Sequence, residues 1–253
     1  MNLVGDLLAR DRRTRETALV TPDGRERTHH DLITNGYKAA NVLRYLGVRA
    51  GATVAVDPTP GFHTTLAFLG AAAVGAPVRF DPDAGIDAGD RVVLASVATA
   101  SGFDPAPGTN LAAFGGPPER PETTHWEQEL WSENPGMPPS DVGPDDDAIL
   151  GSDRSFSHRD LCSLAAAAVE AAEMGEETRV VLRRSFTDSP ALAAGLVAPL
   201  SVGGTAVLAP PAPESEAAAA PGESRGDVAV APDGVDVPEP RRIAPASLAS
   251  AIE

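Results

Sequence analysis

Two stretches of the chain repeat one order of expected elements: helix, strand, helix, strand. They cover residues 28–80 and 157–208. Each stretch opens with a hydroxyl residue three positions before an aspartate, at Thr28–Asp31 and Ser157–Asp160, which is typical of the capping box at a helix N-terminus. Because both copies stand in the same order, the sequence predicts an α/β fold in which two similar αβαβ half-domains pack face to face.

The expected strands are short apolar runs, and the helices between them are rich in alanine. Such runs are typical of strands that are covered on both faces. The first stretch predicts helix 28–47, strand 53–56, helix 64–74 and strand 77–80, and the second predicts helix 157–175, strand 179–182, helix 191–202 and strand 205–208. Outside them we expect strands at 91–95 and 111–114, a short helix at 125–131 and an edge strand at 227–230.

The composition of the chain changes twice along its length, which suggests three segments. We expect residues 1–144 to form the first half-domain and a connector, and residues 145–210 to form the second half-domain. Residues 211–253 are expected to be an acidic, Ala/Pro-rich linker with the edge strand. Within this last segment the low-complexity run 214–222 predicts a mobile linker. In the first segment, we expect the side chains of Trp126 and Trp131 to pack on a half-domain.

Residues 189–213 carry no formal charge and are long enough to span a bilayer. Pro190, Pro199 and the pair Gly203-Gly204 interrupt this stretch, and such residues break a continuous helix. The sequence therefore favours a buried helix, a turn and a buried strand over a membrane span.

Acidic side chains outnumber basic ones, 36 against 20, for a net charge of −16, and Lys38 is the only lysine. This balance resembles that of proteins from salt-loving microbes, in which surface acid maintains solubility. It argues against nucleic acid as a partner, because phosphates require clustered basic side chains. The single cysteine, Cys162, cannot form an intramolecular disulfide, and residues 1–10 lack the basic start of a signal peptide. We therefore expect a cytoplasmic protein without membrane contact.

Residues 18–32 read A-L-V-x-P-D-G-x-x-x-T-x-x-D-L, and residues 40–56 read A-N-x-L-R-x-L-G-V-x-x-G-x-x-V-A-V. This succession resembles the opening of the AMP-forming acyl-CoA synthetases, the adenylate-forming ligase superfamily. The collinear resemblance extends to about residue 210 through segments 66–70, 74–78, 145–150, 157–161, 193–200 and 203–208. It implies the N-terminal domain of that family, in which two α/β half-domains face one another.

The departures from the family pattern concern the nucleotide site. The family carries a Ser/Thr/Gly-rich phosphate loop ending in Pro-Lys between the segments that resemble residues 145–150 and 157–161. Here only Gly151–Phe156 connects them, with one glycine and no lysine, and Asp153 would repel a triphosphate. The family's later aromatic-histidine element would fall at Phe186-Thr187, where no histidine stands.

The resemblance therefore transfers no catalytic residue to this chain. The sequence ends at Glu253, before the family's adenine and ribose motifs and its C-terminal domain with the catalytic lysine. Lys38 lies in the first expected helix and cannot take that role. We therefore predict no catalytic residue, no metal site and no cofactor, and leave the residues of a cofactor-binding site undefined.

Other candidate side chains have simple structural interpretations. The five histidines, His29, His30, His63, His125 and His158, show no zinc spacing, and His30 and His158 are expected to follow the helix caps in surface or capping roles. Cys162 is expected to be a small buried apolar residue, and Asp145–Asp147 a solvated charge run rather than a divalent-ion site. Arg183-Arg184 offers a basic spot for an anion, but we expect a surface charge pair at a strand end.

Three functional hypotheses remain open from the sequence. The first is a degenerate, non-catalytic synthetase-like protein that binds a metabolite or regulates a related full-length ligase, or associates with itself. The second is one half of a split AMP-forming ligase that a partner chain completes. The third is an interaction scaffold without a small-molecule site. Because the phosphate loop should lie in this half, its absence from the sequence favours the first hypothesis.

Overall fold

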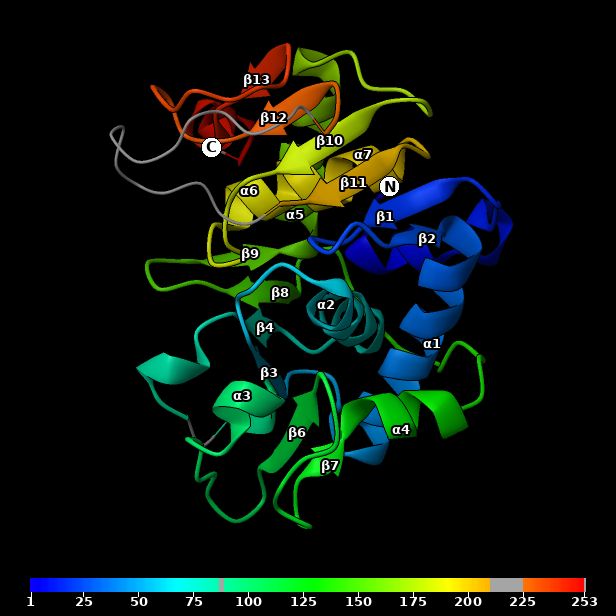
Figure 1. Cartoon of the computed structure of the whole chain (residues 1–253), viewed down its shortest axis with the longest axis vertical. Helices are drawn as coiled ribbons and strands as arrows, with labels where there is room; N and C mark the ends of the chain where they lie inside the picture. The colour runs from blue at the N-terminus through cyan, green and yellow to red at the C-terminus, as the bar shows by residue number, and fades with distance from the viewer. Residues whose placement is uncertain (87–88, 210–224, 253) are drawn as a thin grey trace.

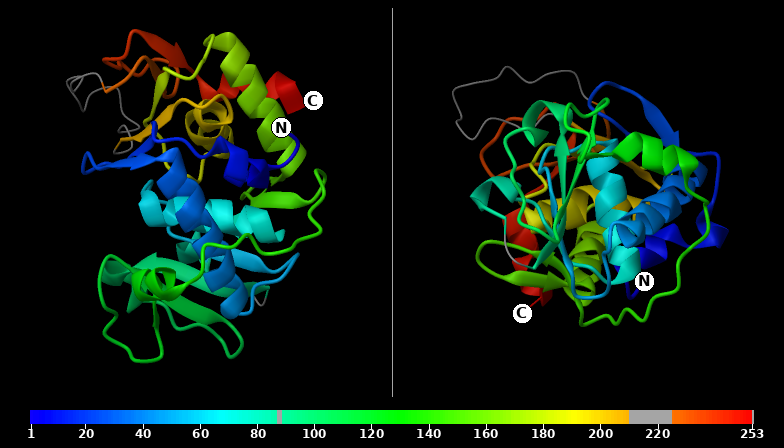
Figure 2. Two further views of the ribbon diagram at one scale, coloured as in Figure 1. Left: turned by 90° about the vertical axis from the view of Figure 1, so that its right-hand side faces the viewer. Right: turned by 90° about the horizontal axis from the view of Figure 1, so that it is seen from below.

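The computed structural model describes residues 1–86, 89–209 and 225–252, which form two sheets with helices between and around them (Figure 1). Sheet A has six strands in the order β13-β12-β10-β11-β1-β2, and sheet B has seven in the order β7-β6-β5-β3-β4-β8-β9. Figures 1 and 2 place helix α2 (Phe62–Val74) between the two sheets. The predicted α/β class with two similar lobes is confirmed.

Sheet B is parallel throughout except for its last pair, β8 and β9. Its strands are β3 (Thr53–Val56), β4 (Val78–Arg79), β5 (Asp90–Ser96), β6 (Asn110–Phe114), β7 (Thr124–His125), β8 (Asp147–Leu150) and β9 (Ser155–Ser157). Sheet A is parallel except for its last pair, β1 and β2. Its strands are β1 (Thr17–Val20), β2 (Glu26–Thr28), β10 (Arg179–Leu182), β11 (Thr205–Leu208), β12 (Val228–Val230) and β13 (Arg241–Ile243).

Each sheet ends in an antiparallel hairpin that leads into a capped helix. Hairpin β1–β2 leads into α1 (His29–Tyr45), and hairpin β8–β9 leads into α5 (His158–Ala171). Strand β1 joins sheet A beside β11, with Leu19 opposite Ala206, while β8 joins sheet B beside β4, with Ile149 opposite Val78. The two lobes are therefore interlocked, because sheet A contains β1 and β2 from before the first capped helix, and sheet B contains β8 and β9 from before the second.

Both predicted capping boxes are present. The Thr28 hydroxyl accepts a hydrogen bond of 3.0 Å from the Asp31 amide, and the Ser157 hydroxyl accepts one of 3.1 Å from the Asp160 amide. In return each aspartate accepts a hydrogen bond from the amide of its capping residue. These bonds satisfy amides that a helix start leaves without an intrahelical partner.

The remaining helical segments are short. They are the 3₁₀ turns η1 (Val4–Leu8), η2 (Arg10–Arg12), η3 (Pro82–Ala84) and η5 (Pro245–Ile252), and the α-helices α3 (Val97–Ala100), α4 (Trp126–Ser132), α6 (Ser189–Leu192) and α7 (Ala198–Ser201). A single π-helical turn, η4 (Ala193–Val197), makes α6 and α7 one continuous helix. Pro199 lacks the amide that would bond the Gly195 carbonyl in an α-helix, which accounts for the wider turn.

Helices α1 and α2 pack closely within the first lobe, and a row of aromatic rings connects the two lobes. Gly70 of α2 faces α1 so closely that an added Cβ would lie 2.8 Å from the Ala40 nitrogen. The rings of Phe68 and Phe80 lie 6.0 Å apart, and those of Phe80 and Phe186 lie 5.3 Å apart. Phe68 belongs to the first lobe and Phe186 follows β10 of the second, so this row crosses the lobe boundary.

Several expectations require correction. Trp126 is fully buried as expected, but Trp131 is 87% exposed, because it points away from the core at the end of α4. The segment expected as an edge strand, β12, lies inside sheet A between β10 and β13, and β13 was not predicted from the sequence. Strands β1, β2, β7, β8 and β9 were not predicted either, since strands of two to four residues show little periodicity. The expected linker 214–222 lies outside the described residues.

Residues 189–208 form the helix α6–η4–α7, a turn and strand β11, which confirms a helix, a turn and a buried strand. Within the described ranges, no helix is both long and apolar enough to cross a membrane.

Candidate functional site

The carboxyl ends of β4, β8 and β10 meet at a cleft of about 390 Å³. In parallel α/β sheets this is the edge at which ligands usually bind. We call it the hairpin cleft, because the turn of hairpin β8–β9 forms one wall. Its lining residues are Arg79, Phe80, Asp81, Gly85, Ile149, Leu150, Gly151, Ser152, Phe186 and Thr187.

The bridge Gly151–Phe156 folds as a tight turn rather than as an open loop. Leu150 of β8 pairs with Ser155 of β9, which leaves only four residues for the turn. The Gly151 amide donates to the Arg154 carbonyl at 3.2 Å, and an added Cβ at Gly151 would lie 2.7 Å from the same oxygen. The amide of the only glycine in the bridge is therefore used within the turn.

The arginines around the hairpin cleft are each held by a carboxylate. Arg79 contacts the buried Asp90 carboxylate at 2.6 Å and also donates to the Gly85 carbonyl. Arg154 lies over the ring of Phe156 and is 3.3 Å from the Asp160 carboxylate. Pairing with carboxylates cancels much of the positive field that these side chains would present to an anion.

The back wall of the hairpin cleft is aromatic. Phe186 is fully buried, its ring meets that of Phe80 edge to face, and its amide donates to the Pro58 carbonyl at 3.1 Å. Thr187 lies beside it and is exposed. This is the position at which the resemblance implies an aromatic-histidine element, and the histidine is replaced by a hydroxyl side chain.

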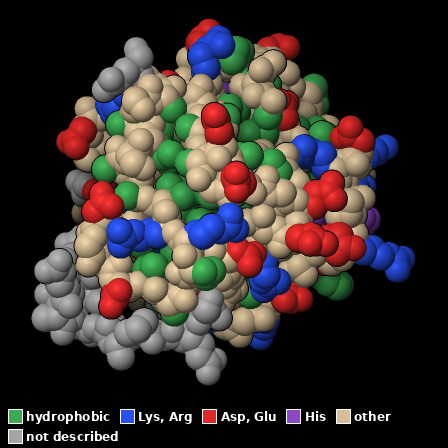
Figure 3. Space-filling view, turned by 90° about the horizontal axis from the view of Figure 1, so that it is seen from above, with side chains coloured by type: hydrophobic (Ala, Val, Ile, Leu, Met, Phe, Trp, Pro, Cys, Tyr) green, Lys and Arg blue, Asp and Glu red, His purple; other side chains and the backbone are tan. Residues whose placement is uncertain are grey.

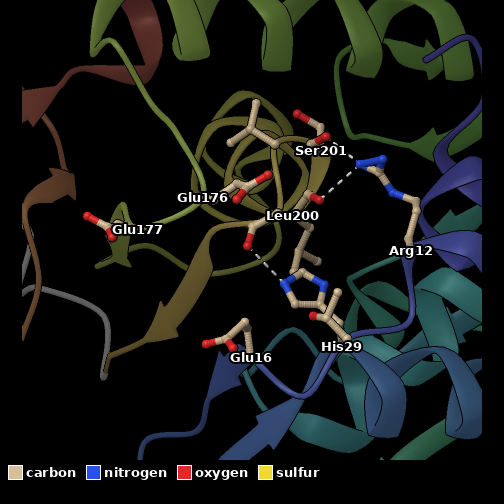
Figure 4. A pocket seen from close by; sticks show the side chains of 10 residues that line it. Arg12, Glu16, His29, Glu176, Glu177, Leu200 and Ser201 are labelled. Atoms are coloured by element: carbon tan, nitrogen blue, oxygen red, sulfur yellow. Dashed lines mark hydrogen bonds between the residues drawn. The ribbon is translucent and has the colours of Figure 1, made fainter.

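A second hollow, of about 670 Å³, lies near the amino ends of β10 and β11 (Figure 4). We call it the Arg12 pocket, and its lining residues are Arg12, Thr14, Glu16, His29, Glu176, Glu177, Leu200, Ser201, Val202 and Gly203. Arg12 Nη2 donates to the Leu200 carbonyl at 3.2 Å and to the Ser201 carbonyl, at the C-terminus of α7. His29 Nε2 lies 3.2 Å from the Gly203 carbonyl oxygen. No local sequence pattern indicates this hollow, because its lining comes from segments that are far apart along the chain.

The histidines that follow the two helix caps are His29 and His158, so the expected correspondence of His30 with His158 was off by one residue. Both His29 and His158 are buried, whereas His30 is exposed. His158 Nδ1 accepts a hydrogen bond of 3.2 Å from the Val4 amide. Burial lowers the pKa of both histidines, and for His29 this outweighs the opposing effect of the Gly203 and Gly204 carbonyls.

The other two histidines share one carboxylate. Glu127 Oε1 lies 3.7 Å from His63 Nε2, and Glu127 Oε2 lies 3.5 Å from His125 Nε2. Glu127 also accepts a hydrogen bond of 2.5 Å from the Gly115 amide after β6. In the described part of the chain no three His, Cys, Asp or Glu side chains are arranged to hold a metal ion.

The remaining candidates are mostly engaged in local contacts. Burial raises the pKa of the half-buried Cys162 thiol to about 11. Asp145 pairs with Arg159 at 2.8 Å, and Asp146 accepts from the Gly143 amide, so this acidic run is used locally. Lys38 lies on α1, 3.4 Å from the Trp131 carbonyl, and lines neither hollow.

The expectation of a surface charge pair at Arg183-Arg184 is half correct. Arg184 pairs with Asp188 at 2.9 Å near the surface. Arg183 instead holds the fully buried carboxylate of Glu239, which comes from the C-terminal segment. On the face of the molecule seen from above, acidic and basic side chains are interspersed with apolar ones (Figure 3).

The fold agrees with solved ligase structures at low sequence identity. No family model matches the chain. No curated protein matches it in sequence either. A benzoate CoA ligase from Burkholderia xenovorans LB400 superposes on 90% of the chain with a TM-score of 0.69 and 22% identity, and 50% of that protein is covered.

Two further structures give the same result. ATP-bound MatB from Rhodopseudomonas palustris has a TM-score of 0.71 and 16% identity over 90% of this chain and 49% of that one. The N-terminal domain of FACL13 from Mycobacterium tuberculosis has a TM-score of 0.67 and 21% identity over 84% of this chain and 58% of that one. The chain thus spans about half the length of these structures, and it has the fold of the N-terminal domain of the AMP-forming acyl-CoA ligases.

Proposed function

We propose that this chain is a non-catalytic acyl-CoA synthetase-like protein with a binding or regulatory role. The observation that carries the proposal is the β8–β9 turn, in which the Gly151 amide bonds the Arg154 carbonyl. A phosphate-binding loop has to direct several free amides and a cation toward the ligand. Here the turn is four residues long and its arginine is paired with Asp160.

Charge in the hairpin cleft supports the same conclusion. Transfer of an adenylyl group develops negative charge on phosphate oxygens, which an enzyme stabilises with fixed donors or cations. Among the described residues, Arg79 is the only basic side chain that lines the cleft, and it contacts Asp90. Asp81 lines the same cleft and opposes a polyphosphate. The cleft is thus better suited to an uncharged ligand than to ATP.

A thermal-shift screen with ATP, AMP, CoA and acyl-CoA tests the proposal, because a ligand that binds the native state raises the melting temperature. We expect no shift with ATP or AMP, and a shift with CoA or acyl-CoA would identify a retained metabolite site. Exchange of pyrophosphate into ATP above background, with any of a broad panel of carboxylic acids, would refute the non-catalytic assignment.

The alternative of a split ligase is motivated by the half-length match to the solved structures. It requires a partner chain that supplies the remaining ligase elements. Purification from native lysate at high salt distinguishes the two: a stoichiometric companion together with exchange activity supports the split ligase, and an inactive protein without a companion supports our proposal. If neither metabolite nor companion binds, the interaction-scaffold hypothesis gains support instead.

A further inference from the structure

We infer that the N-terminal segment, Met1–Leu8, is an acid-sensitive connection between the two lobes, which opens when His158 takes up a proton. The segment contains η1 and packs against α1 and α2 of the first lobe and α5 of the second. On the first lobe, an added Cβ at Gly36 of α1 would lie 2.6 Å from Leu8 Cδ2. On the second lobe, the segment reaches His158, the first residue of α5. The inference does not depend on a ligand in the hairpin cleft.

The hydrogen bond between the segment and α5 depends on the protonation state of His158. The Val4 amide donates to His158 Nδ1 at 3.2 Å, and both residues are fully buried. A ring nitrogen accepts a hydrogen bond only when it carries no hydrogen, so the neutral ring has its hydrogen on Nε2. Addition of a proton makes Nδ1 a donor as well, and two donors then face each other without an acceptor.

The protonated ring has no acceptor on its other side either. His158 Nε2 is buried and has no hydrogen-bond partner among the described residues. A buried charge without such partners is costly, and the ring stands at the start of α5, where the helix dipole disfavours a cation. Burial accordingly lowers the pKa of His158. Proton uptake therefore favours a state in which the segment has moved away and water reaches the ring.

The charged groups around His158 do not remove this dependence on pH. Asp146, which precedes β8, and Asp6 of η1 raise the pKa of the ring, but burial outweighs them. The other titratable groups on and beside α5, on β8 and at the chain start are Arg159, Asp160, Cys162, Glu170, Asp145, Asp147 and the Met1 ammonium. Groups of these types ordinarily titrate outside the range from about pH 5 to about pH 7. The other elements that pack most closely against α5, which are β9, α6, η4, α7 and η5, carry no titratable side chain.

The end of the segment is held independently of His158. The Tyr37 hydroxyl donates to the Leu8 carbonyl at 2.6 Å, and the side chains of Leu7 and Leu8 are buried. Neither contact involves a group that changes charge in mild acid. We therefore expect residues 1–5 to detach from α5 while Leu7 and Leu8 stay on the first lobe.

Native-state hydrogen exchange at the Val4 amide tests the inference. Its protection factor should be constant above about pH 6.5 and fall by up to about tenfold per pH unit below it, because the opening takes up one proton. The exchange should be insensitive to low concentrations of urea, since a local opening exposes little surface. Val181, which lies in β10 between β11 and β12, reports global unfolding. A Val4 protection factor that does not change with pH, or that equals that of Val181 at every urea concentration, would overturn the inference.

A matched pair of variants assigns the pH effect to His158. In His158→Asn the side-chain carbonyl can still accept from the Val4 amide but takes up no proton, so the Val4 protection factor should be the same at about pH 7 and about pH 5.5. His30→Asn is the control, because His30 is exposed near the start of α1, and it should keep the pH dependence of the parent. An acid-induced fall in His158→Asn as large as in the parent would refute the role of His158.

The parent protein provides a second measurement that requires no variant to fold. NMR of the nitrogen-labelled ring should show a hydrogen on Nε2 and none on Nδ1 at about pH 7, and protonation of the ring should coincide with the loss of Val4 protection. A hydrogen on Nδ1 at that pH would contradict the arrangement on which the inference rests.

Discussion

Arg183 holds the carboxylate of Glu239 through two hydrogen bonds, from Nη2 at 2.7 Å and from Nε at 3.0 Å. The two residues stand 56 positions apart, and the carboxylate is fully buried. Burial alone would raise the pKa of Glu239, but the hydrogen bonds from Arg183 and from the Arg225 amide outweigh it and hold the pKa below its ordinary value. This ion pair links the segment before β13 to the residue that follows β10.

Replacement of Glu239 by glutamine should destabilise the protein strongly. It leaves the Arg183 guanidinium buried without its counter-charge, which costs about 3 kcal/mol in comparable cases. Chemical denaturation measures the loss in the free energy of unfolding. Glu26→Gln is the control, because Glu26 pairs with Arg179 at 3.8 Å on the surface and should change stability by less than about 1 kcal/mol. Equal effects of the two substitutions would contradict the role assigned to the buried pair.

Stability should fall as the pH drops below the ordinary histidine range. Burial lowers the pKa of His158 from 6.5, although the Asp6 and Asp146 carboxylates act in the opposite direction. Below about pH 6.5 the unfolded chain therefore binds more protons than the folded chain. The free energy of unfolding is therefore highest above that pH and falls as the pH drops. His158→Gln should reduce the pH dependence of the free energy of unfolding between about pH 7 and pH 5.

The exposed His30 provides a control for that measurement. His30→Gln should leave the pH profile of stability as it is in the parent protein, because this side chain lies at the surface next to the buried His29. Identical profiles for His158→Gln and the parent would show that the buried ring does not control acid stability.

Gly70→Ala should lower the free energy of unfolding by about 1–3 kcal/mol, since the added methyl would have to push α1 away from α2. Backbone atoms of Ala39 and Ala40 lie at 3.0 and 2.8 Å from the new Cβ and cannot move independently. Gly136→Ala is the control, because no heavy atom lies within 4 Å of its Cβ position. A neutral Gly70→Ala would mean that the two helices tolerate a wider spacing.

Cys162 should react slowly with thiol reagents while the protein is folded. Burial raises its pKa to about 11, so at pH 8 the thiolate is on the order of 10²-fold scarcer than in a free cysteine. The rate of reaction with Ellman's reagent, measured in native buffer and again in denaturant, tests this. The same rate in both solutions would show that the folded protein does not protect the thiol.

Much of the fold could be predicted from local sequence patterns. Strands β10 and β11 have the predicted bounds, and both capping boxes form as expected. Four-residue apolar runs and caps are recognisable because all the information lies within a few positions. The hairpin strands β1, β2, β8 and β9 were not predicted, because each has only three or four residues and pairs through backbone groups that the sequence does not reveal.

The candidate site was predictable only in part. The short bridge Gly151–Phe156 was recognisable from the sequence, and in the structure it folds as a four-residue turn. The Arg12 pocket gave no signal, since Arg12 and the Leu200 carbonyl that fixes it are 188 positions apart. The burial of His158 depends on the Val4 amide, 154 positions away.

The sequence by itself determined where helices start and which short runs become strands, because capping and periodicity act between near neighbours. Only the tertiary structure decided that β1 lies beside β11, that Glu239 neutralises Arg183 and that three glutamates face Arg12 across one hollow. Those outcomes depend on which distant segments pack together. The burial of apolar side chains makes the largest contribution to the free energy of that packing. Charged side chains take the positions that this packing leaves to them.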